Sequence, residues 1–197
     1  MKSRPSRGLA PRTVFMAIVL SAVIPFALAW YLAQHPDLVE KTSNYGRLVQ
    51  PVRVLTREML TSALLSDAVG KEEIKGRWIL LEVSQAECLR ECLDALHKTH
   101  QGWLMLNKEM QRVRRVFLGN AEIGADSALP KDETLIQGGL GQDLLQILRE
   151  VTEGEGLDGV VFLIDPQMNL ALWYPAGFDP YQLVKDLRHL LRASQIG

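Results

Sequence analysis

Cysteine and clustered positive charge are both scarce in this 197-residue chain. It contains two cysteines, and after residue 36 it has 18 Lys and Arg residues against 23 Asp and Glu residues. Nucleic-acid phosphates need clustered Lys and Arg, so this mildly acidic body excludes nucleic-acid binding. A composition that is 47% hydrophobic and 23% charged is that of a globular protein, and the length allows one ordinary domain with an appendage.

Formal charge is absent from Thr13 to Gln34, where almost every residue is apolar. A helix over this stretch is long enough to cross a bilayer core of about 30 Å. The positive charges that precede it orient the N-terminus towards the cytoplasm. We therefore expect a cytoplasmic N-terminus over 1–12, a single transmembrane anchor over 13–34 in a bacterial inner membrane, and a periplasmic domain. In that compartment the two cysteines can form a disulfide.

A cleaved signal peptide is the alternative to an anchor. Residues 27–29, Ala-Leu-Ala, resemble a cleavage site of small residues. The apolar stretch is longer than the roughly 7–15 residues of a signal peptide and continues through Trp30 and Tyr31. The pattern favours an uncleaved anchor.

Hydrophobic periodicity predicts the elements of the exported part. Pro36 and Pro51 interrupt any helix in 35–76, which we expect to be a stalk and an extended approach, with 57–70 unassigned. From residue 77 onwards, strand-like and helix-like patterns alternate. The predicted order is a strand at 76–84, a helix at 86–110 with a break or an end at Gly102, a strand at 112–119, a helix at 142–151, strands at 159–165 and 170–174, and a helix at 181–193 that Asp179 caps and Pro180 begins.

This order of elements is that of a thioredoxin-like fold, an α/β sheet with flanking helices, over 77–197. In such sheets, ligands and chemistry gather at the carboxyl ends of strands, where helices begin. Cys88 and Cys92 lie at such a point, between the first strand and the first helix. A helix N-terminus also lowers the pKa of a thiol, which favours metal binding or thiol exchange.

The stretch AECLREC leaves several roles open for Cys88 and Cys92. Residues four apart share one face of a helix, with Cβ atoms about 5–6 Å apart, and two thiolates there suit Cu(I). A disulfide prefers Cβ atoms about 3.8 Å apart, so it requires either a distorted first turn or a Cys88 that precedes the helix. Two small buried hydrophobic residues are the simplest alternative.

A third metal ligand is not identified in the sequence. His97 and His100 cannot join both cysteines on one regular helix, because each is rotated away from them or displaced along the axis. His35 and His189 are expected to be surface residues.

Three other patterns receive structural interpretations. The stretch GGLGQDL, 138–144, lacks the last glycine of a dinucleotide-binding motif and is expected to be a loop that leads into a helix. Met105, Met110 and Met168 are too scattered for a copper-binding array and are explained by packing. In the stretch RVRRVFLG, 112–119, arginines are interleaved with apolar residues. This pattern predicts an edge strand whose arginines face solvent.

The chain resembles the Sco (SenC/PrrC) family of membrane-anchored thioredoxin-fold proteins that help assemble the copper centre of cytochrome c oxidase. The resemblance spans roughly 40–193 and rests on the order of the anchor, NYGRLVQP, WILLEV before C-x-x-x-C, RVRRVFL and VVFLIDPQMNLALWYP. It implies a copper site made by Cys88, Cys92 and a histidine just before the late strand. Here EGEGLDGVVFLID offers Glu155 and Asp158 but no histidine, and Leu93 stands where the family usually has a proline.

The resulting hypothesis is a membrane-anchored, thioredoxin-like accessory protein in cytochrome c oxidase assembly. Cys88 and Cys92 would act as a thiol reductant, with Cys88 as the attacking group, or would carry Cu(I) transiently. The expected partner is a cytochrome c oxidase subunit or another copper or thiol assembly protein. The alternative is a non-catalytic scaffold or binding module of a respiratory membrane complex, which predicts buried, unreactive thiols. A general thiol oxidoreductase is less favoured, because no proline precedes the strand at 159–165.

Overall fold

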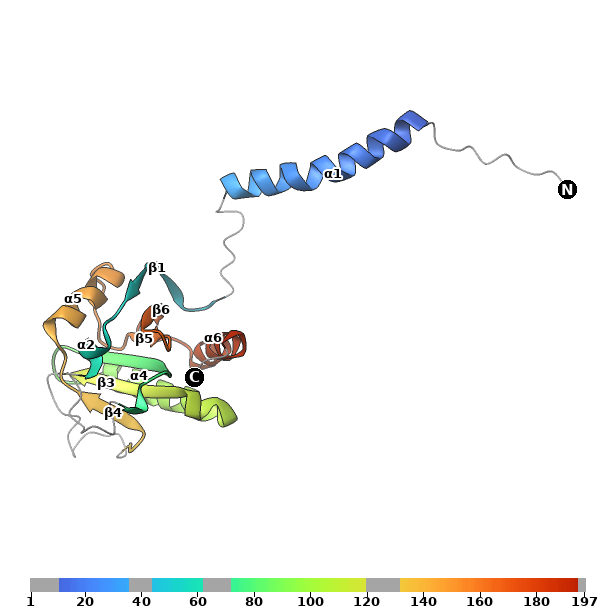
Figure 1. Ribbon diagram of the computed structural model, residues 1–197. Helices are drawn as coiled ribbons and strands as arrows, with labels where there is room; N and C mark the ends of the chain where they lie inside the picture. The colour runs from blue at the N-terminus through green and yellow to red at the C-terminus, as the bar shows by residue number, and fades with distance from the viewer. Residues whose placement is uncertain (1–10, 36–43, 62–71, 120–131, 195–197) are drawn as a thin grey trace. The chain divides into compact units, whose positions relative to one another are not determined.

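The computed structural model describes residues 11–35, 44–61, 72–119 and 132–194 (Figure 1). The chain divides into two compact units, Met1–Ser43 and Asn44–Gly197. In the first unit, α1 (Pro11–Gln34) contains Pro25 in its interior. Its segment Val14–Gln34 has a mean hydropathy of 2.2, so the helix is long and apolar enough to cross a membrane. It is a candidate for the single transmembrane span that the sequence predicts.

The second unit is a mixed six-stranded sheet with helices on both faces (Figure 1). The strand order is β1-β6-β5-β2-β3-β4, in which β2, β3 and β4 are parallel and the pairs β2–β5, β5–β6 and β6–β1 are antiparallel. Its elements are β1 (Arg47–Val54), α2 (Arg57–Thr61), β2 (Trp78–Ser84), α4 (Arg90–Met105), the 3-10 helix η2 (Asn107–Arg112), β3 (Val113–Gly119), β4 (Leu135–Gly138), α5 (Gln142–Val151), β5 (Val161–Ile164), β6 (Asn169–Tyr174) and α6 (Pro180–Ala193).

Alternate residues of the central strand β2 build two cores. Ile79 and Leu81 pack on one side of the sheet with residues of α5 and α2, whereas Trp78 and Leu80 pack on the other side with residues of α4 and α6. All seven residues of β2 are buried, because both faces of this strand are covered. The apolar run that predicts a buried strand is therefore confirmed, and it places the carboxyl end of β2 against the start of α4.

The folded unit begins earlier than the sequence indicates. We expected a stalk up to residue 76, but Asn44 already belongs to the compact unit and β1 pairs with β6 at the edge of the sheet. Only Val49 of β1 is buried, so the strand lacks the apolar alternation by which strands are recognised. Pro51 is compatible with an edge strand, because the outer side of such a strand needs no hydrogen-bond donor.

The arginine-rich strand is not at an edge. The sequence predicts that 112–119 exposes its arginines at a sheet edge, but β3 lies between β2 and β4, and Arg115 is 1% exposed. The short strand β4 covers it, and the four-residue pattern of β4 is too short to be recognised from periodicity. The prediction was therefore wrong, because a strand found only in the tertiary structure pairs with β3.

The predicted helices at 142–151 and 181–193 agree with α5 and α6. The predicted helix at 86–110 is shorter in the structure, because α4 begins at Arg90 and ends at Met105, and the prediction for Gly102 also differs. This glycine neither breaks nor ends α4, and a Cβ built there would lie 3.4 Å from the side chains of Leu183 and Val184 on α6. It allows α4 and α6 to pack closely. Asp179 caps α6 by accepting a hydrogen bond from the Tyr181 backbone N–H, and Pro180 is its first residue, as predicted.

Candidate functional site

Cys88 and Cys92 form a disulfide at the junction of β2 and α4. Their Cα atoms are 5.3 Å apart, within the usual range for a disulfide. Helix α4 begins at Arg90, so Cys88 precedes it, and the capping residue Leu89 is extended, with φ −97° and ψ −161°. The sequence left two ways to close a disulfide here, and the structure uses the one in which Cys88 lies before the helix.

The two cysteines differ in their exposure to solvent. Cys92 is 4% exposed and packs with Leu96 on α4 and Phe117 on β3, whereas Cys88 is half-buried against the same cluster. Leu89, between the two cysteines, is 64% exposed. A partner can therefore reach Cys88 before Cys92. The fully buried thiols that a scaffold role predicts do not match the exposure of Cys88.

The loop before β5 lies against the same turn. A Cβ built on Gly159 would be 3.0 Å from the backbone oxygen of Glu91, and Gly159 has φ +76°, which favours glycine. Beside it, a carboxylate oxygen of Asp158 lies 3.0 Å from the Ser84 hydroxyl at the end of β2. Of the two acidic residues that stand before the late strand, Asp158 thus reaches the site, whereas Glu155 pairs with Arg47 on β1 at 2.9 Å.

The described residues do not offer a metal centre at the cysteines. No group of three or more His, Cys, Asp or Glu side chains in this part of the chain could hold an ion. His97 contacts Gln101 and His100 contacts Asp132, while His35 and His189 are exposed, so the described histidines are engaged elsewhere or at the surface. A copper site with three protein ligands, which the Sco resemblance implies, does not fit these residues.

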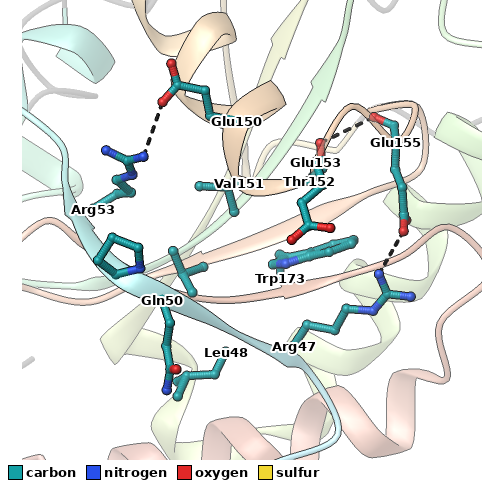
Figure 2. A pocket seen from close by; sticks show the side chains of 12 residues that line it. Arg47, Leu48, Gln50, Arg53, Glu150, Val151, Thr152, Glu153, Glu155 and Trp173 are labelled. Atoms are coloured by element: carbon teal, nitrogen blue, oxygen red, sulfur yellow. Dashed lines mark hydrogen bonds and ion pairs between the residues drawn. The ribbon is translucent and has the colours of Figure 1, made fainter.

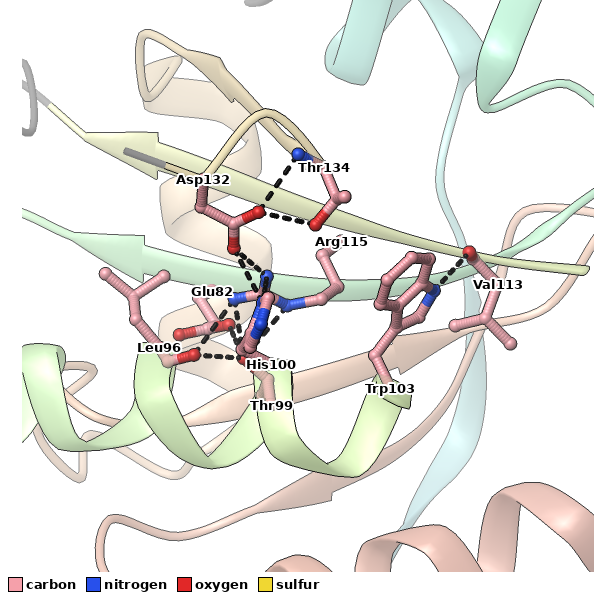
Figure 3. Close-up of polar contacts among 9 residues, drawn as sticks. All are labelled: Glu82, Leu96, Thr99, His100, Trp103, Val113, Arg115, Asp132 and Thr134. Carbon is pink, nitrogen blue, oxygen red and sulfur yellow. Dashed lines mark hydrogen bonds and ion pairs between the residues drawn. The ribbon is translucent and has the colours of Figure 1, made fainter. Parts of the chain in front are cut away.

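Further along α4, a buried ionic network lies between the helix and the sheet (Figure 3). Arg115 on β3 donates to the Leu96 backbone oxygen at 2.9 Å and to the Thr99 hydroxyl oxygen at 3.2 Å, and it pairs with Asp132. Thr99 donates to a carboxylate oxygen of Glu82 on β2 at 2.5 Å. Glu82 is 3% exposed, and its second oxygen has no hydrogen-bond partner among the described residues. The network joins α4, β2, β3 and the segment before β4.

The pKa values of the two carboxyl groups in this network shift in opposite directions. Removal from water raises the pKa of Glu82 to about 7, although Thr99 and Arg115 oppose the shift. Partial burial alone would raise the pKa of Asp132 as well. There, hydrogen bonds from Thr134 and Arg115 outweigh the burial and lower the pKa to about 2. The charge of Glu82 thus changes near neutral pH.

Sequence reasoning missed this network, although one signal was present. Glu82 and Arg115 are charged residues inside otherwise apolar strands, WILLEVS and VRRVFLG. Charged side chains are rarely fully buried unless they are paired, so two such interruptions in neighbouring strands predict a pair. The pairing of β2 with β3 sets Glu82 opposite Phe117, next to Cys92, and only the structure supplies that register.

A separate cavity of about 220 Å³ lies between β1, the end of α5 and Trp173 on β6 (Figure 2). The Arg47 guanidinium stacks over the Trp173 ring at 4.6 Å, and Arg53 pairs with Glu150 at 3.3 Å. Neither cysteine lines this cavity. Its charged side chains connect β1 to α5, which explains their positions without a ligand.

The match to a family model agrees with the fold. Residues 78–194 match the model of a family described as a transmembrane-like, thioredoxin-like C-terminal domain. Similar solved structures include copper-bound ScoI of Arabidopsis thaliana, at 18% identity and a TM-score of 0.46, over 62% of this chain and 89% of that one. Copper-bound yeast Sco1 is 11% identical, with a TM-score of 0.47, over 62% of this chain and 83% of that one.

A third similar structure is a thiol:disulfide interchange protein from Bacteroides sp. It is 14% identical, with a TM-score of 0.46, over 76% of this chain and 91% of that one. No curated protein matches the chain in sequence. The family model covers more than half of the chain and contains both cysteines. The chain therefore belongs to the family of transmembrane-like, thioredoxin-like C-terminal domains.

Proposed function

We propose that this chain is a membrane-tethered, thioredoxin-like accessory protein of cytochrome c oxidase assembly that exchanges thiols and disulfides through Cys88 and Cys92. The observation that supports this proposal most strongly is the Cys88–Cys92 disulfide at the strand-to-helix junction, with Cys88 half-buried and Cys92 4% exposed. The link to the oxidase comes from the sequence resemblance to the Sco family. Helix α1 supports the membrane location. The positive charges that precede it support an N-terminus in the cytoplasm of a bacterial cell and a folded unit in the periplasm.

In the reduced protein, the Cys88 thiolate attacks one sulfur of a partner disulfide and releases one partner thiolate, which takes up a proton. The Cys92 thiolate then attacks the Cys88 sulfur of the mixed disulfide and releases the second partner thiol. Two electrons and two protons pass from the dithiol to the partner, and the Cys88–Cys92 disulfide forms. An exported thiol reductant must restore the dithiol before the next cycle.

Several features of the site support this order of attack. Cys88 is the more exposed cysteine, and it lies just before the N-terminus of α4, whose dipole stabilises a thiolate. Cys92 is fixed in the cluster with Leu96 and Phe117, one turn from Cys88, so it is held where it can resolve a mixed disulfide. The exposed Leu89 beside Cys88 offers an apolar contact to a partner.

Transient Cu(I) carriage by Cys88 and Cys92 is the other version of this hypothesis. The described residues add no third ligand, so copper would be held by the two thiolates alone. Titration of the reduced full chain with Cu(I) separates the versions. One tightly bound Cu(I) ion that is lost on either Cys→Ser substitution supports Cu(I) carriage. If Cu(I) binding does not depend on the cysteines, thiol exchange remains as the version of the hypothesis.

The test of exchange uses the reduced full chain, in nanodiscs, with a peptide dimer joined by a disulfide. The wild type should release two peptide thiols per chain and re-form its own disulfide. Cys92→Ser should retain one peptide as a mixed disulfide on Cys88, and Cys88→Ser should react much more slowly, because Cys92 is buried.

Two outcomes contradict the proposal. If Cys88→Ser traps the peptide and Cys92→Ser does not, the two roles are reversed. If both reduced cysteines resist modification in the folded chain, the protein is a scaffold. In cells, the double Cys→Ser variant should lose its support of oxidase assembly, and full support by that variant would remove both the exchange and the copper versions.

A further inference from the structure

The outward face of α6 is basic. The helix packs on the sheet through Leu183, Val184, Leu187 and Leu191, and its only acidic residue, Asp186, is 1% exposed. Its exposed face instead carries Tyr181, Lys185, Arg188, His189 and Arg192. Three cations therefore face solvent on one helix without a carboxylate among them.

None of these three cations forms an ion pair with a described residue. The Lys185 amine contacts the Tyr45 hydroxyl at 2.9 Å, Arg188 donates to the Met105 backbone oxygen at 2.6 Å, and Arg192 donates to the Arg188 backbone oxygen at 3.1 Å. All three acceptors are uncharged. The ion pairs of the described residues involve other cations. Because the chain beyond residue 36 carries 18 basic and 23 acidic residues, this face contrasts with an acidic body.

The start of the folded unit is attached to this same helix. The buried carboxylate of Asp186 accepts hydrogen bonds from the backbone N–H groups of Tyr45 and Gly46, at 2.8 and 2.9 Å, and from the Tyr174 hydroxyl at 3.0 Å. Lys185 also lies over the Tyr45 ring, 5.0 Å from its centroid. Tyr45 and Gly46, near the start of the folded unit, are thus held against α6, with Tyr45 beside Lys185.

The length of the connection limits how far this face can be from a membrane. Residues 35–43 join Gln34, the end of α1, to Asn44. At about 3.5 Å per residue, such a segment reaches roughly 30 Å when fully extended. If α1 spans a membrane, the lipid surface is the anionic partner that this tether keeps at high local concentration.

We propose that Lys185, Arg188 and Arg192, together with Tyr45 and Tyr181, dock the folded unit onto anionic phospholipid headgroups of the membrane that α1 spans. The proposal rests on the anchor of the proposed function. Each Lys or Arg near an anionic surface strengthens binding by about fivefold, so three give roughly a hundredfold. Tyrosine is favoured at the interface because its ring is apolar and its hydroxyl is polar. Docking would hold the Cys88–Cys92 turn at a fixed height above the bilayer.

The test follows acylation of Lys185 by a water-soluble amine reagent, read by mass spectrometry, with Lys75 as the internal reference. The full chain is placed in nanodiscs of phosphatidylcholine alone or of an equal mixture with phosphatidylglycerol. The ratio of the acylation rate of Lys185 to that of Lys75 should fall by about fivefold or more, and only in the anionic discs. About 1 M NaCl, which shortens the Debye length to about 3 Å, should restore it.

Two double variants distinguish an effect of the basic face of α6 from an effect of the net charge of the chain. Arg188→Gln with Arg192→Gln should weaken docking about 25-fold and return the ratio towards its value in phosphatidylcholine. Arg57→Gln with Arg149→Gln removes the same charge elsewhere and should leave the ratio low. Equal ratios for the wild type in both kinds of disc would overturn the proposal, as would an equal effect of the two paired variants.

The result is separable from thiol exchange. The double Cys→Ser variant should dock as the wild type does, so a failure of exchange leaves the docking result unchanged. A chain that does not enter the discs would overturn the anchor and the docking together.

Discussion

The first turn of α4 and its middle turns contact the same strands in different ways. At the first turn, Cys92 packs with Leu96 and Phe117, and the half-buried Cys88 is joined to it by a disulfide. In the middle turns, Thr99 and the Leu96 backbone oxygen bind the buried Arg115. Hydrogen bonds to a buried charge are directional, whereas apolar packing is not. The network therefore fixes the position of the helix. In the proposed thiol exchange, the disulfide would open and close beside a helix that does not move.

Arg115→Met should give the largest loss of stability. It removes a 1% exposed cation and leaves the carboxylates of Glu82 and Asp132 without it, which costs about 3–5 kcal/mol of unfolding free energy. Urea unfolding measures the loss. Arg114→Met, at the adjacent and more exposed position that pairs with Glu73 at 3.7 Å, should cost less than about 1 kcal/mol. Equal losses would show that the network does not fix α4.

Glu82 should make stability depend on pH. Its pKa is about 7 in the folded chain against 4.5 for an unperturbed carboxyl, so the folded state binds the proton more tightly than the unfolded state does. The associated stability is fully present below pH 4.5 and is lost as the pH rises to about 7. At about 1.4 kcal/mol per unit, the loss is roughly 3 kcal/mol.

This pH dependence is measured by urea unfolding of the wild type, Glu82→Gln and the exposed control Glu133→Gln. The difference in stability between the wild type and Glu82→Gln should change by about 3 kcal/mol between pH 4.5 and 7, in favour of Glu82→Gln at the higher pH. Glu133→Gln should follow the wild type. Parallel curves for all three would show that folding does not raise the pKa of Glu82.

A pair of glycine variants addresses the first turn. Gly159 and Gly177 have φ +76° and +81°, but only Gly159 has neighbours where a Cβ would be added, at 3.0 Å from the Glu91 backbone oxygen. Gly177→Ala should cost about 1 kcal/mol through backbone strain, and Gly159→Ala about 2–3 kcal/mol, because the backbone of α4 must also move. Urea unfolding measures both costs.

The glycine pair also tests whether the loop positions the disulfide. Only Gly159→Ala should change the rate at which reduced Cys88 reacts with the peptide disulfide, since Gly159 contacts the turn that holds the cysteines. If Gly159→Ala loses stability as expected but reacts at an unchanged rate, the loop that contains Gly159 does not position the cysteines for exchange.

Sequence patterns predicted the elements with strong local signals. The apolar run of β2 and the helical spacings of α4, α5 and α6 follow from the repeat distances of strands and helices, so each can be recognised alone. The capping of α6 by Asp179 is equally local. The strands β1 and β4 were missed because their stability comes from pairing with distant residues rather than from their own composition.

The sequence by itself determined the apolar anchor candidate, the thioredoxin-like order of elements and the location of both cysteines at a strand-to-helix junction. All three depend on local spacing along the chain. Only the tertiary structure decided that Cys88 precedes the helix, that Arg115 and Glu82 form a buried network beneath it, and that Tyr45 binds the helix bearing Lys185. Those contacts join residues far apart in the chain, and their geometry is set by sheet order and register, which no single segment encodes.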